Sequence, residues 1–210
     1  MIDRQERLAD LVGGPVSRET LEHLETFENL LRKWTRRINL VSRSTLDDVW
    51  DRHILDSAQL FPLAPPDASS WCDLGSGAGF PGLVVALLAR DLRPDLQVSL
   101  VEADGRKAEF LRTVLRETGI EAHVIVARIE DVAAQGATVL SARALAPLSQ
   151  LLAHAERHLA THGVALFPKG ATHAEELRAA LAFRDFRCEK IPSKTDPEAV
   201  IFRISELTRA

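Results

Sequence analysis

The sequence contains few cysteines and no long apolar run, and both absences narrow the class of protein. Its two cysteines, Cys72 and Cys188, are too few for a disulfide framework or a cysteine-rich zinc site. The longest clean apolar run, residues 83–89, is far shorter than the roughly 20 residues that a membrane-spanning helix needs. Residues 1–11 are charged throughout and lack the apolar stretch of a signal peptide. We therefore expect a cytoplasmic protein without a membrane segment.

An excess of positive charge is also missing, because the formal net charge is −4. This argues against a nucleic-acid footprint over the whole surface. Basic residues are nevertheless concentrated between Glu28 and Asp47, where no acidic residue occurs; they are Arg32, Lys33, Arg36, Arg37 and Arg43. Four of them could simply lie in the last turns of a helix, where cations interact favourably with the helix dipole. The alternative is a local basic surface that contacts RNA.

The N-terminal part of the chain has helical periodicity. Apolar residues recur at steps of three and four over residues 21–38, with Ser17 as the expected N-cap. A second helical segment is expected over residues 45–61. The turn-rich stretch 62–70 follows. We therefore place a domain boundary there, between an N-terminal helical region (1–66) and a second domain (67–210).

In the second domain, short runs rich in Val, Ile and Leu alternate with helical segments. The expected strands are residues 70–74, 97–103, 122–127, 138–143, 163–169 and 200–205. The expected helices are residues 81–92, 106–119, 147–159 and 173–183. We place Pro81 and Pro147 at first helical positions, and Gly119 and Gly163 at helix ends.

This alternation predicts an α/β fold with a doubly wound, mostly parallel sheet covered on both faces. The runs at 187–192 and 198–204 have no helix between them, so they predict an antiparallel C-terminal hairpin. In such a sheet, ligands bind beyond the carboxyl ends of the strands, at the point where the strand order reverses.

The glycine-rich stretch WCDLGSGAGFPGL contains a literal G-x-G-x-x-G at Gly77, Gly79 and Gly82. That spacing alone is weak support for a dinucleotide coenzyme. Because the expected strand ends at Gly75, the glycines of the turn are Gly75, Gly77 and Gly79, and Gly82 falls inside the next helix. The dinucleotide match is therefore out of register.

Asp73 precedes the turn and discriminates between ligands. A dinucleotide places two phosphates at such a turn, and a carboxylate at about 4 Å from a phosphate costs on the order of 4 kcal/mol at an effective dielectric of about 20. S-adenosylmethionine has no phosphate, and Asp73 would attract its ammonium and sulfonium. Glu102, at the end of the next strand, is placed to bind ribose hydroxyls. We therefore favour S-adenosylmethionine as the ligand.

Several segments now resemble a known family: DLGSGAGFPG, NLVSRS, RHILDS, VEADGRKAEFL, ARIED, SARAL and FPKG. They occur in the order found in the bacterial guanine-N7 methyltransferases of small-subunit ribosomal RNA, also called the glucose-inhibited division protein B family. The resemblance runs from about residue 20 to the C-terminus. It implies a Rossmann-like methyltransferase that transfers a methyl group from S-adenosylmethionine to guanine N7 in small-subunit ribosomal RNA or a ribosomal particle. We expect the protein to be a monomer.

The resemblance also assigns site residues. The family's cofactor contacts fall on Gly75, Phe80, Ile129, Glu130 and Arg143, with an acidic residue at Glu102; Asp73, Gly77 and Gly79 complete the expected cofactor site. Phe80 departs from the leucine that other members carry.

The residues themselves discount some acceptors. Transfer to cytosine C5 needs a cysteine nucleophile, but Cys72 lies within the first strand and Cys188 lies late in the chain. Transfer to an exocyclic amine typically uses an Asn/Asp-Pro-Pro-aromatic loop, whereas this chain has SARALAP after the fourth strand and no tyrosine. Guanine N7 has a free lone pair and no proton to remove. Catalysis there reduces to positioning, which can supply roughly 7–11 kcal/mol.

Three residues are candidates for catalysis: Arg143, His53 and Asp56. We expect Arg143 to position the donor or the target base, the alternative being an ion pair with Glu130 or Asp131. His53 and Asp56 could form a local structural network with each other or with Arg52. The family resemblance favours instead a role in closing the N-terminal helices over the donor site.

Two further features have competing explanations. Lys169 follows the fifth strand, where it could contact an RNA phosphate or face solvent without a role. His154, His158 and His162 repeat every four residues, but the H-E-x-x-H pattern of a metal site is absent, so we expect no metal.

Three alternatives to the favoured function stay open. They are methyl transfer to another RNA or a small molecule, a nicotinamide-dependent oxidoreductase, and a non-catalytic RNA-binding module.

Overall fold

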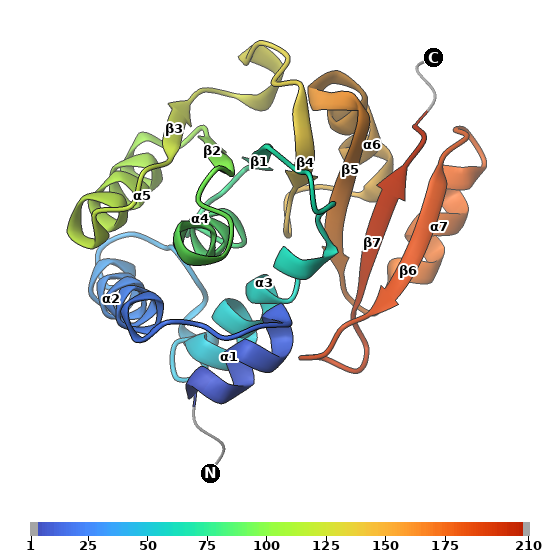
Figure 1. The fold of residues 1–210 in the computed structure, drawn as a ribbon. Helices are drawn as coiled ribbons and strands as arrows, with labels where there is room; N and C mark the ends of the chain where they lie inside the picture. Colours follow the sequence, from blue (N-terminus) through green and yellow to red (C-terminus); the bar gives the residue numbers. More distant parts are fainter. Residues whose placement is uncertain (1–3, 208–210) are drawn as a thin grey trace.

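The computed structural model describes residues 4–207, apart from the side chain of Arg43. Its centre is a seven-stranded sheet in the order β3-β2-β1-β4-β5-β7-β6 (Figure 1). The strands are β1 (Ser70–Leu74), β2 (Gln97–Glu102), β3 (His123–Val126), β4 (Ala137–Ser141), β5 (Leu159–Lys169), β6 (Arg187–Pro192) and β7 (Val200–Ser205). The first five are parallel, whereas β7 runs antiparallel to both β5 and β6. This confirms the doubly wound sheet and its C-terminal hairpin.

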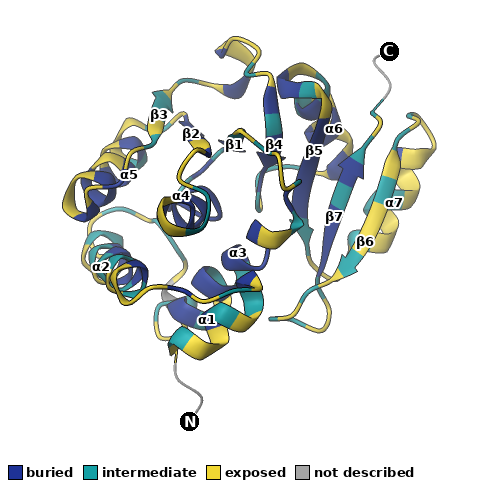
Figure 2. Ribbon diagram, viewed as in Figure 1, coloured by how far each residue is buried: buried dark blue, intermediate teal, exposed yellow. Residues whose placement is uncertain are grey.

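Helices cover both faces of the sheet. They are α1 (Arg4–Val12), α2 (Arg18–Thr35), α3 (Asp56–Ala58), α4 (Gly82–Leu92), α5 (Gly105–Thr118), α6 (Leu148–His158) and α7 (His173–Leu181). The apolar residues of α1, α2, α4 and α5 share one core on one face, and those of α6 and α7 share a second core on the other. The central strands are buried between these layers, whereas the edge strand β6 is largely exposed (Figure 2). None of the helices in residues 4–207 combines the length and apolar character needed to span a bilayer.

The pleat of β1 divides its side chains between the two cores. Trp71 packs with the α4 and α5 layer, whereas Cys72 and Leu74 pack with the α6 layer. Because side chains alternate along a strand, Asp73 points to the same face as Trp71. The carboxylate of Asp73 is thereby directed at α4, not along the strand axis.

Helix α2 joins the N-terminal region to the sheet domain. Ser17 caps the helix, as expected, and accepts a hydrogen bond from the Thr20 amide at 3.1 Å. Its apolar stripe includes Leu24, Phe27 and Leu31, which are fully buried. Burial of each such side chain stabilises the fold by about 1.5–3 kcal/mol. The ring of Phe27 lies 5.1 Å from that of Phe80, so the stripe reaches the residue that follows the glycine turn.

The structure differs from the sequence expectation in four places. Helix α1 was not expected. The segment at 45–61 contains a π-helix, Trp50–Leu55, that continues into α3. Pro81 and Pro147 are N-caps and not first helical residues. Gly119 does end α5 in the left-handed region, but Gly163 lies within β5. A Cβ at Gly163 would come 2.7 Å from the Ala137 carbonyl oxygen, so the close approach of β4 explains this glycine.

Candidate functional site

The glycine turn begins where β1 ends. Gly75, Gly77 and Gly79 have φ values of 64°, 56° and 93°, which glycine adopts without steric cost. A Cβ at Gly75 would lie 2.6 Å from the Leu145 side chain, so the turn packs directly against the loop that follows β4. The Ser76 amide donates to the Val101 carbonyl at 3.0 Å and fixes the turn to β2. The turn is therefore a shaped element at the carboxyl ends of the central strands.

Glu102 holds the middle of this turn. Its Oε2 accepts a hydrogen bond from the Gly77 amide at 2.7 Å, and its Oε1 accepts one from the Asp104 amide at 2.8 Å. Only 7% of the residue is exposed. Glu102 is thus the bridge between the glycine turn and the N-terminus of α5, which Asp104 caps.

Asp73 lies in a buried polar cluster and has no exposed surface. Its Oδ1 accepts from the Ser141 hydroxyl at 2.6 Å, which in turn accepts from Trp71 Nε1 at 2.8 Å. Its Oδ2 accepts from the Gly82 amide at 3.2 Å, at the start of α4. Asp73 and Ser141 are register partners on β1 and β4, which explains their contact. Burial raises the pKa of Asp73 to about 6, although the hydrogen bonds from Ser141 and Gly82 oppose this shift.

This geometry changes the reason why Asp73 disfavours a dinucleotide. We expected a carboxylate open to the pocket that would attract a cationic ligand. The carboxylate instead occupies the N-terminus of α4, where the amides of a dinucleotide-binding helix would receive a phosphate. A Cβ at Gly82 would come within 2.7 Å of Asp73, so the helix starts tightly against the carboxylate. The Gly82 amide at the start of α4 is therefore already paired with a carboxylate.

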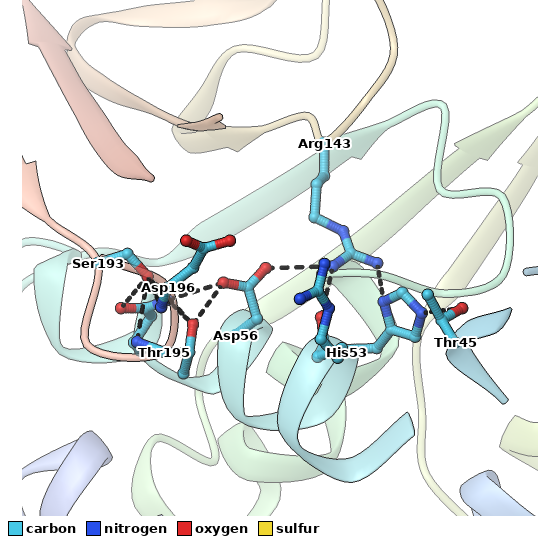
Figure 3. Close-up of polar contacts among 9 residues, drawn as sticks. Thr45, His53, Asp56, Arg143, Ser193, Thr195 and Asp196 are labelled. Atoms are coloured by element: carbon cyan, nitrogen blue, oxygen red, sulfur yellow. Dashed lines mark hydrogen bonds and ion pairs between the residues drawn. The ribbon is translucent and has the colours of Figure 1, made fainter. Parts of the chain in front are cut away.

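Arg143 is the centre of a second polar cluster (Figure 3). Its Nη1 donates to Asp56 Oδ2 at 3.1 Å, and its Nη2 donates to His53 Nδ1 at 3.0 Å. The guanidinium lies over the Phe80 ring, 5.0 Å from the centroid. The next residue, Ala144, has a φ of 52°, a strained value that turns the chain sharply after β4. The alternative pairing of Arg143 with Glu130 or Asp131 was wrong, because its acidic partner comes from the N-terminal region.

His53 is neutral in this cluster. Burial and, next, the charge of Arg143 lower its pKa to about 4. Because Nδ1 accepts from Arg143, the ring proton lies on Nε2, which donates to the Thr45 hydroxyl at 3.0 Å. The His53 ring stacks on Phe80 with centroids 5.0 Å apart. His53 and Asp56 thus do belong to a local network, but the side chain that both of them bind is Arg143, not each other or Arg52.

A cavity of about 860 Å³ opens beside Arg143 at the carboxyl ends of β4 and β5. Its volume is within the range of small-ligand pockets. Its walls come from the π-helix, the β4–α6 loop, the end of β5 and the loop between β6 and β7. Leu145 lines the cavity and also contacts the glycine turn, so the two features adjoin.

Two residues that the sequence does not single out bind Asp56 at one wall of this cavity. Thr195, in the loop between β6 and β7, donates its hydroxyl to Asp56 Oδ1 at 2.8 Å. Gln59 donates to the same oxygen at 3.0 Å. The turn-forming stretch SKTDPE was the only local signal, and it predicts a loop without indicating what the loop contacts.

The structure gives Lys169 an internal role. Its Nζ lies 2.8 Å from Glu176 Oε2 and donates to the Ala146 carbonyl at 2.9 Å. Only 10% of the side chain is exposed. Glu176 Oε2 also accepts from the Leu148 amide at the start of α6. Lys169 is therefore better explained as an internal cation than as a phosphate contact or a solvent-facing lysine.

The basic residues near the end of α2 divide into two groups. Arg32 pairs with Glu28 at 2.6 Å and is partly buried. Lys33, Arg36 and Arg37 are exposed. Only Arg32 and Lys33 lie in the last turn, since Arg36 is the C-cap and Arg37 follows it. The expected placement in the last turns thus holds for Arg32 and Lys33, while Arg36 and Arg37 lie at and just beyond the helix end. The Arg43 side chain lies outside the described part.

The remaining expected cofactor residues lie on a 3-10 turn after β3. Ile129 is buried, and the exposed Glu130 lies 3.9 Å from the ring of His154. His158 is fully buried on α6, whereas His162 is exposed on β5, so the three histidines do not converge. Within residues 4–207, no group of three side chains is arranged to bind a metal ion.

Comparison with known proteins gives consistent matches. The family model for rRNA small subunit methyltransferase G matches residues 20–199. A Ribosomal RNA small subunit methyltransferase G of Ruegeria sp. (strain TM1040) is 50% identical, over 92% of this chain and 94% of its own length. One from Rhodospirillum centenum (strain ATCC 51521 / SW) is 54% identical, over 91% of this chain and 87% of its own length.

Solved structures resemble the fold. A methyltransferase from Geobacter sulfurreducens has a TM-score of 0.59 at 18% identity, covering 89% of both chains. A TehB-like SAM-dependent methyltransferase from Corynebacterium glutamicum has a TM-score of 0.57 at 17% identity, covering 87% of this chain and 98% of its own. At these identities the likeness supports the Rossmann-like methyltransferase fold.

Proposed function

The chain belongs to the rRNA small subunit methyltransferase G family, and from this we propose that it methylates N7 of a guanine in small-subunit (16S) ribosomal RNA. The methyl donor is S-adenosylmethionine, which supplies an electrophilic methyl group on a sulfonium. One observation carries the proposal: Arg143 lines the cavity of about 860 Å³, where Asp56 binds its guanidinium and the ring of Phe80, next to the glycine turn, lies beneath it.

The glycine turn fits a donor without phosphate. The positive φ values of Gly75, Gly77 and Gly79 shape the turn at the carboxyl end of β1, and Glu102 lies at the end of β2, where ribose-binding acids occur in this fold. The N-terminus of α4 is already occupied by Asp73. The turn, Glu102 and the 3-10 turn at Ile129 and Glu130 would together hold the donor. The same geometry argues against a nicotinamide coenzyme at this site.

The cluster around Arg143 suits transfer to N7. Both Asp56 oxygens accept hydrogen bonds, and His53 Nδ1 accepts from Arg143. Neither residue is therefore a free general base, and N7 requires none because it carries no proton. Arg143 can donate to guanine O6 beside N7. Alignment of N7 with the methyl group is an effect worth roughly 7–11 kcal/mol in favourable cases.

The exposed cations Lys33, Arg36 and Arg37 form the proposed RNA-contacting surface, within an N-terminal region (1–66) that lies on the substrate side. Cations of this kind bind phosphates without reading sequence. We place the protein in the cytoplasm, where bacterial ribosomes are assembled, and propose that it acts as a monomer without a metal.

The direct test is methyl transfer by the purified protein with donor labelled in the methyl group. Small subunits and free ribosomal RNA from a strain lacking this protein serve as acceptors, and the product is mapped by mass spectrometry. We expect one 7-methylguanosine. Arg143→Ala should lower turnover at least about 100-fold while the fold remains intact, because it removes a positioning contact. Transfer to a small molecule alone, or wild-type turnover in Arg143→Ala, would contradict the proposal.

Calorimetry separates the remaining alternatives. The proposed enzyme binds S-adenosylhomocysteine, whereas a nicotinamide oxidoreductase would bind NADH instead. A non-catalytic RNA-binding module would bind RNA and neither small molecule.

A further inference from the structure

The loop between β6 and β7, residues 193–199, reaches across the cavity to the N-terminal segment. Thr195 donates to Asp56 Oδ1 at 2.8 Å, and the Lys194 amide donates to Gln59 Oε1 at 2.8 Å. These pairs are separated by 139 and 135 residues in sequence. The loop is thus attached to the short helical segment that carries His53 and Asp56 (Figure 3).

The loop is internally ordered by its own hydrogen bonds. The Ser193 hydroxyl accepts from the Thr195 amide at 3.2 Å and from the Asp196 amide at 3.3 Å. The Ser193 amide donates to the Ala199 carbonyl at 3.0 Å, which closes the loop at its base. Such side-chain to backbone bonds restrict the conformations of a turn. Thr195 is therefore presented to Asp56 from a defined position.

The two carboxylate oxygens of Asp56 have separate partners. Oδ2 accepts from Arg143, while Oδ1 accepts from both Thr195 and Gln59. With Oδ1 held in this way, the carboxylate cannot rotate without losing two bonds, so the direction of Oδ2 is fixed. A hydrogen bond to a charged group is among the stronger ones in proteins.

We propose that Thr195 and Gln59 are positioning residues for methyl transfer, which act through Asp56 to hold the Arg143 guanidinium over Phe80 beside the acceptor cavity. The proposal rests on the proposed function, since its kinetic readout is methyl transfer to RNA. Both residues contact Asp56 and reach Arg143 through it. Their effect is on the fraction of molecules in which Arg143 is correctly oriented.

The test compares Thr195→Val, which removes the hydroxyl at similar volume, with Thr195→Ser, which keeps it. We expect Thr195→Val to lower kcat about tenfold, with the KM for RNA and the Kd for S-adenosylhomocysteine within about twofold of wild type. Thr195→Ser should restore kcat. Thr161→Val is the matched control, because Thr161 is an exposed threonine on β5, and it should leave kcat unchanged.

A double variant tests the route through Asp56. Since Asp56→Asn already weakens the contact with Arg143, adding Thr195→Val should lower kcat no further. A second full tenfold loss on that background would show that Thr195 acts by another route.

NMR of the His53 ring gives a readout that loop packing alone would not change. After burial, the charge of Arg143 is the largest influence that lowers the pKa of His53. Release of Arg143 in Thr195→Val should therefore move the His53 titration to higher pH, and Thr195→Ser should reverse the movement. An unmoved His53 titration, or a loss of activity confined to the KM for RNA, would overturn the proposal. Absence of RNA methylation by the wild-type protein would refute the proposed function, but the His53 titration would still report on the contact.

Discussion

Asp73→Asn tests whether burial or hydrogen bonding controls the Asp73 carboxylate. The side chain is fully buried, and its pKa is raised from 3.8 to about 6. Because the raised pKa favours the protonated form in the folded state, the stability linked to that proton is fully present below pH 3.8. It is lost as the pH rises towards 6. The shift of about 2 units corresponds to about 3 kcal/mol, at about 1.4 kcal/mol per unit.

Asparagine cannot ionise and keeps an acceptor for the Gly82 amide. We therefore expect the difference in the free energy of unfolding, Asp73→Asn minus wild type, to increase by about 2–3 kcal/mol between pH 4 and pH 7.5. The variant thus gains stability relative to wild type as the pH rises. Near pH 4 the variant should be less stable than wild type by about 1 kcal/mol. The reason is that the amide nitrogen of asparagine takes the place of Oδ1, which accepts the hydrogen bond from the Ser141 hydroxyl.

The measurement is urea unfolding of both proteins at several pH values, and only the difference between them matters, since all other titrating groups cancel. Asp67→Asn, at an exposed aspartate, is the matched control for the substitution itself. A pH-independent difference for Asp73→Asn would refute the reasoning. It would mean that the hydrogen bonds from Ser141 and Gly82 fully offset burial, so that the pKa of Asp73 is the same in the folded and unfolded states.

Two further predictions concern basic residues. Lys169→Met should lower the free energy of unfolding by about 2–3 kcal/mol, because Glu176 loses its partner in a partly buried pair. The affinity of the Lys169→Met variant for RNA should depend on salt concentration as that of wild type does. Wild-type stability together with weaker RNA binding would instead indicate that Lys169 contacts an RNA phosphate. Substitution of both Arg36 and Arg37 by Gln should reduce the slope of log K against log salt concentration by about 1.4–1.8, as expected for two lost phosphate contacts. Fluorescence anisotropy over a salt series measures this slope, and a slope equal to that of wild type would remove both residues from the RNA surface.

The local sequence was sufficient to locate nearly all of the secondary structure. Period-two and period-3.6 patterns predicted the strands and helices of the second domain, because the exposure of each side chain follows the geometry of its own segment. The turn at Gly75, Gly77 and Gly79 was also predicted, since its backbone conformation depends on residue type. The π-helix at 50–55 was missed because its hydrogen bonds join residues five apart, whereas the apolar pattern was compared with the 3.6-residue period of an α-helix.

Contacts between distant segments could not be obtained in this way. The sequence indicated that Asp73, His53, Asp56 and Arg143 matter, but the two acidic partners that it offered as an alternative role for Arg143 were wrong, and it left Asp73 open to the pocket. Their partners depend on the register of β1 with β4 and on where the loop between β6 and β7 closes. Local propensity carries no information about such pairings, because each hydrogen bond joins residues that only the packed sheet brings together. The sequence by itself therefore determined most of the elements and the glycine turn, whereas only the tertiary structure decided which partners the polar side chains around Asp73 and Arg143 contact.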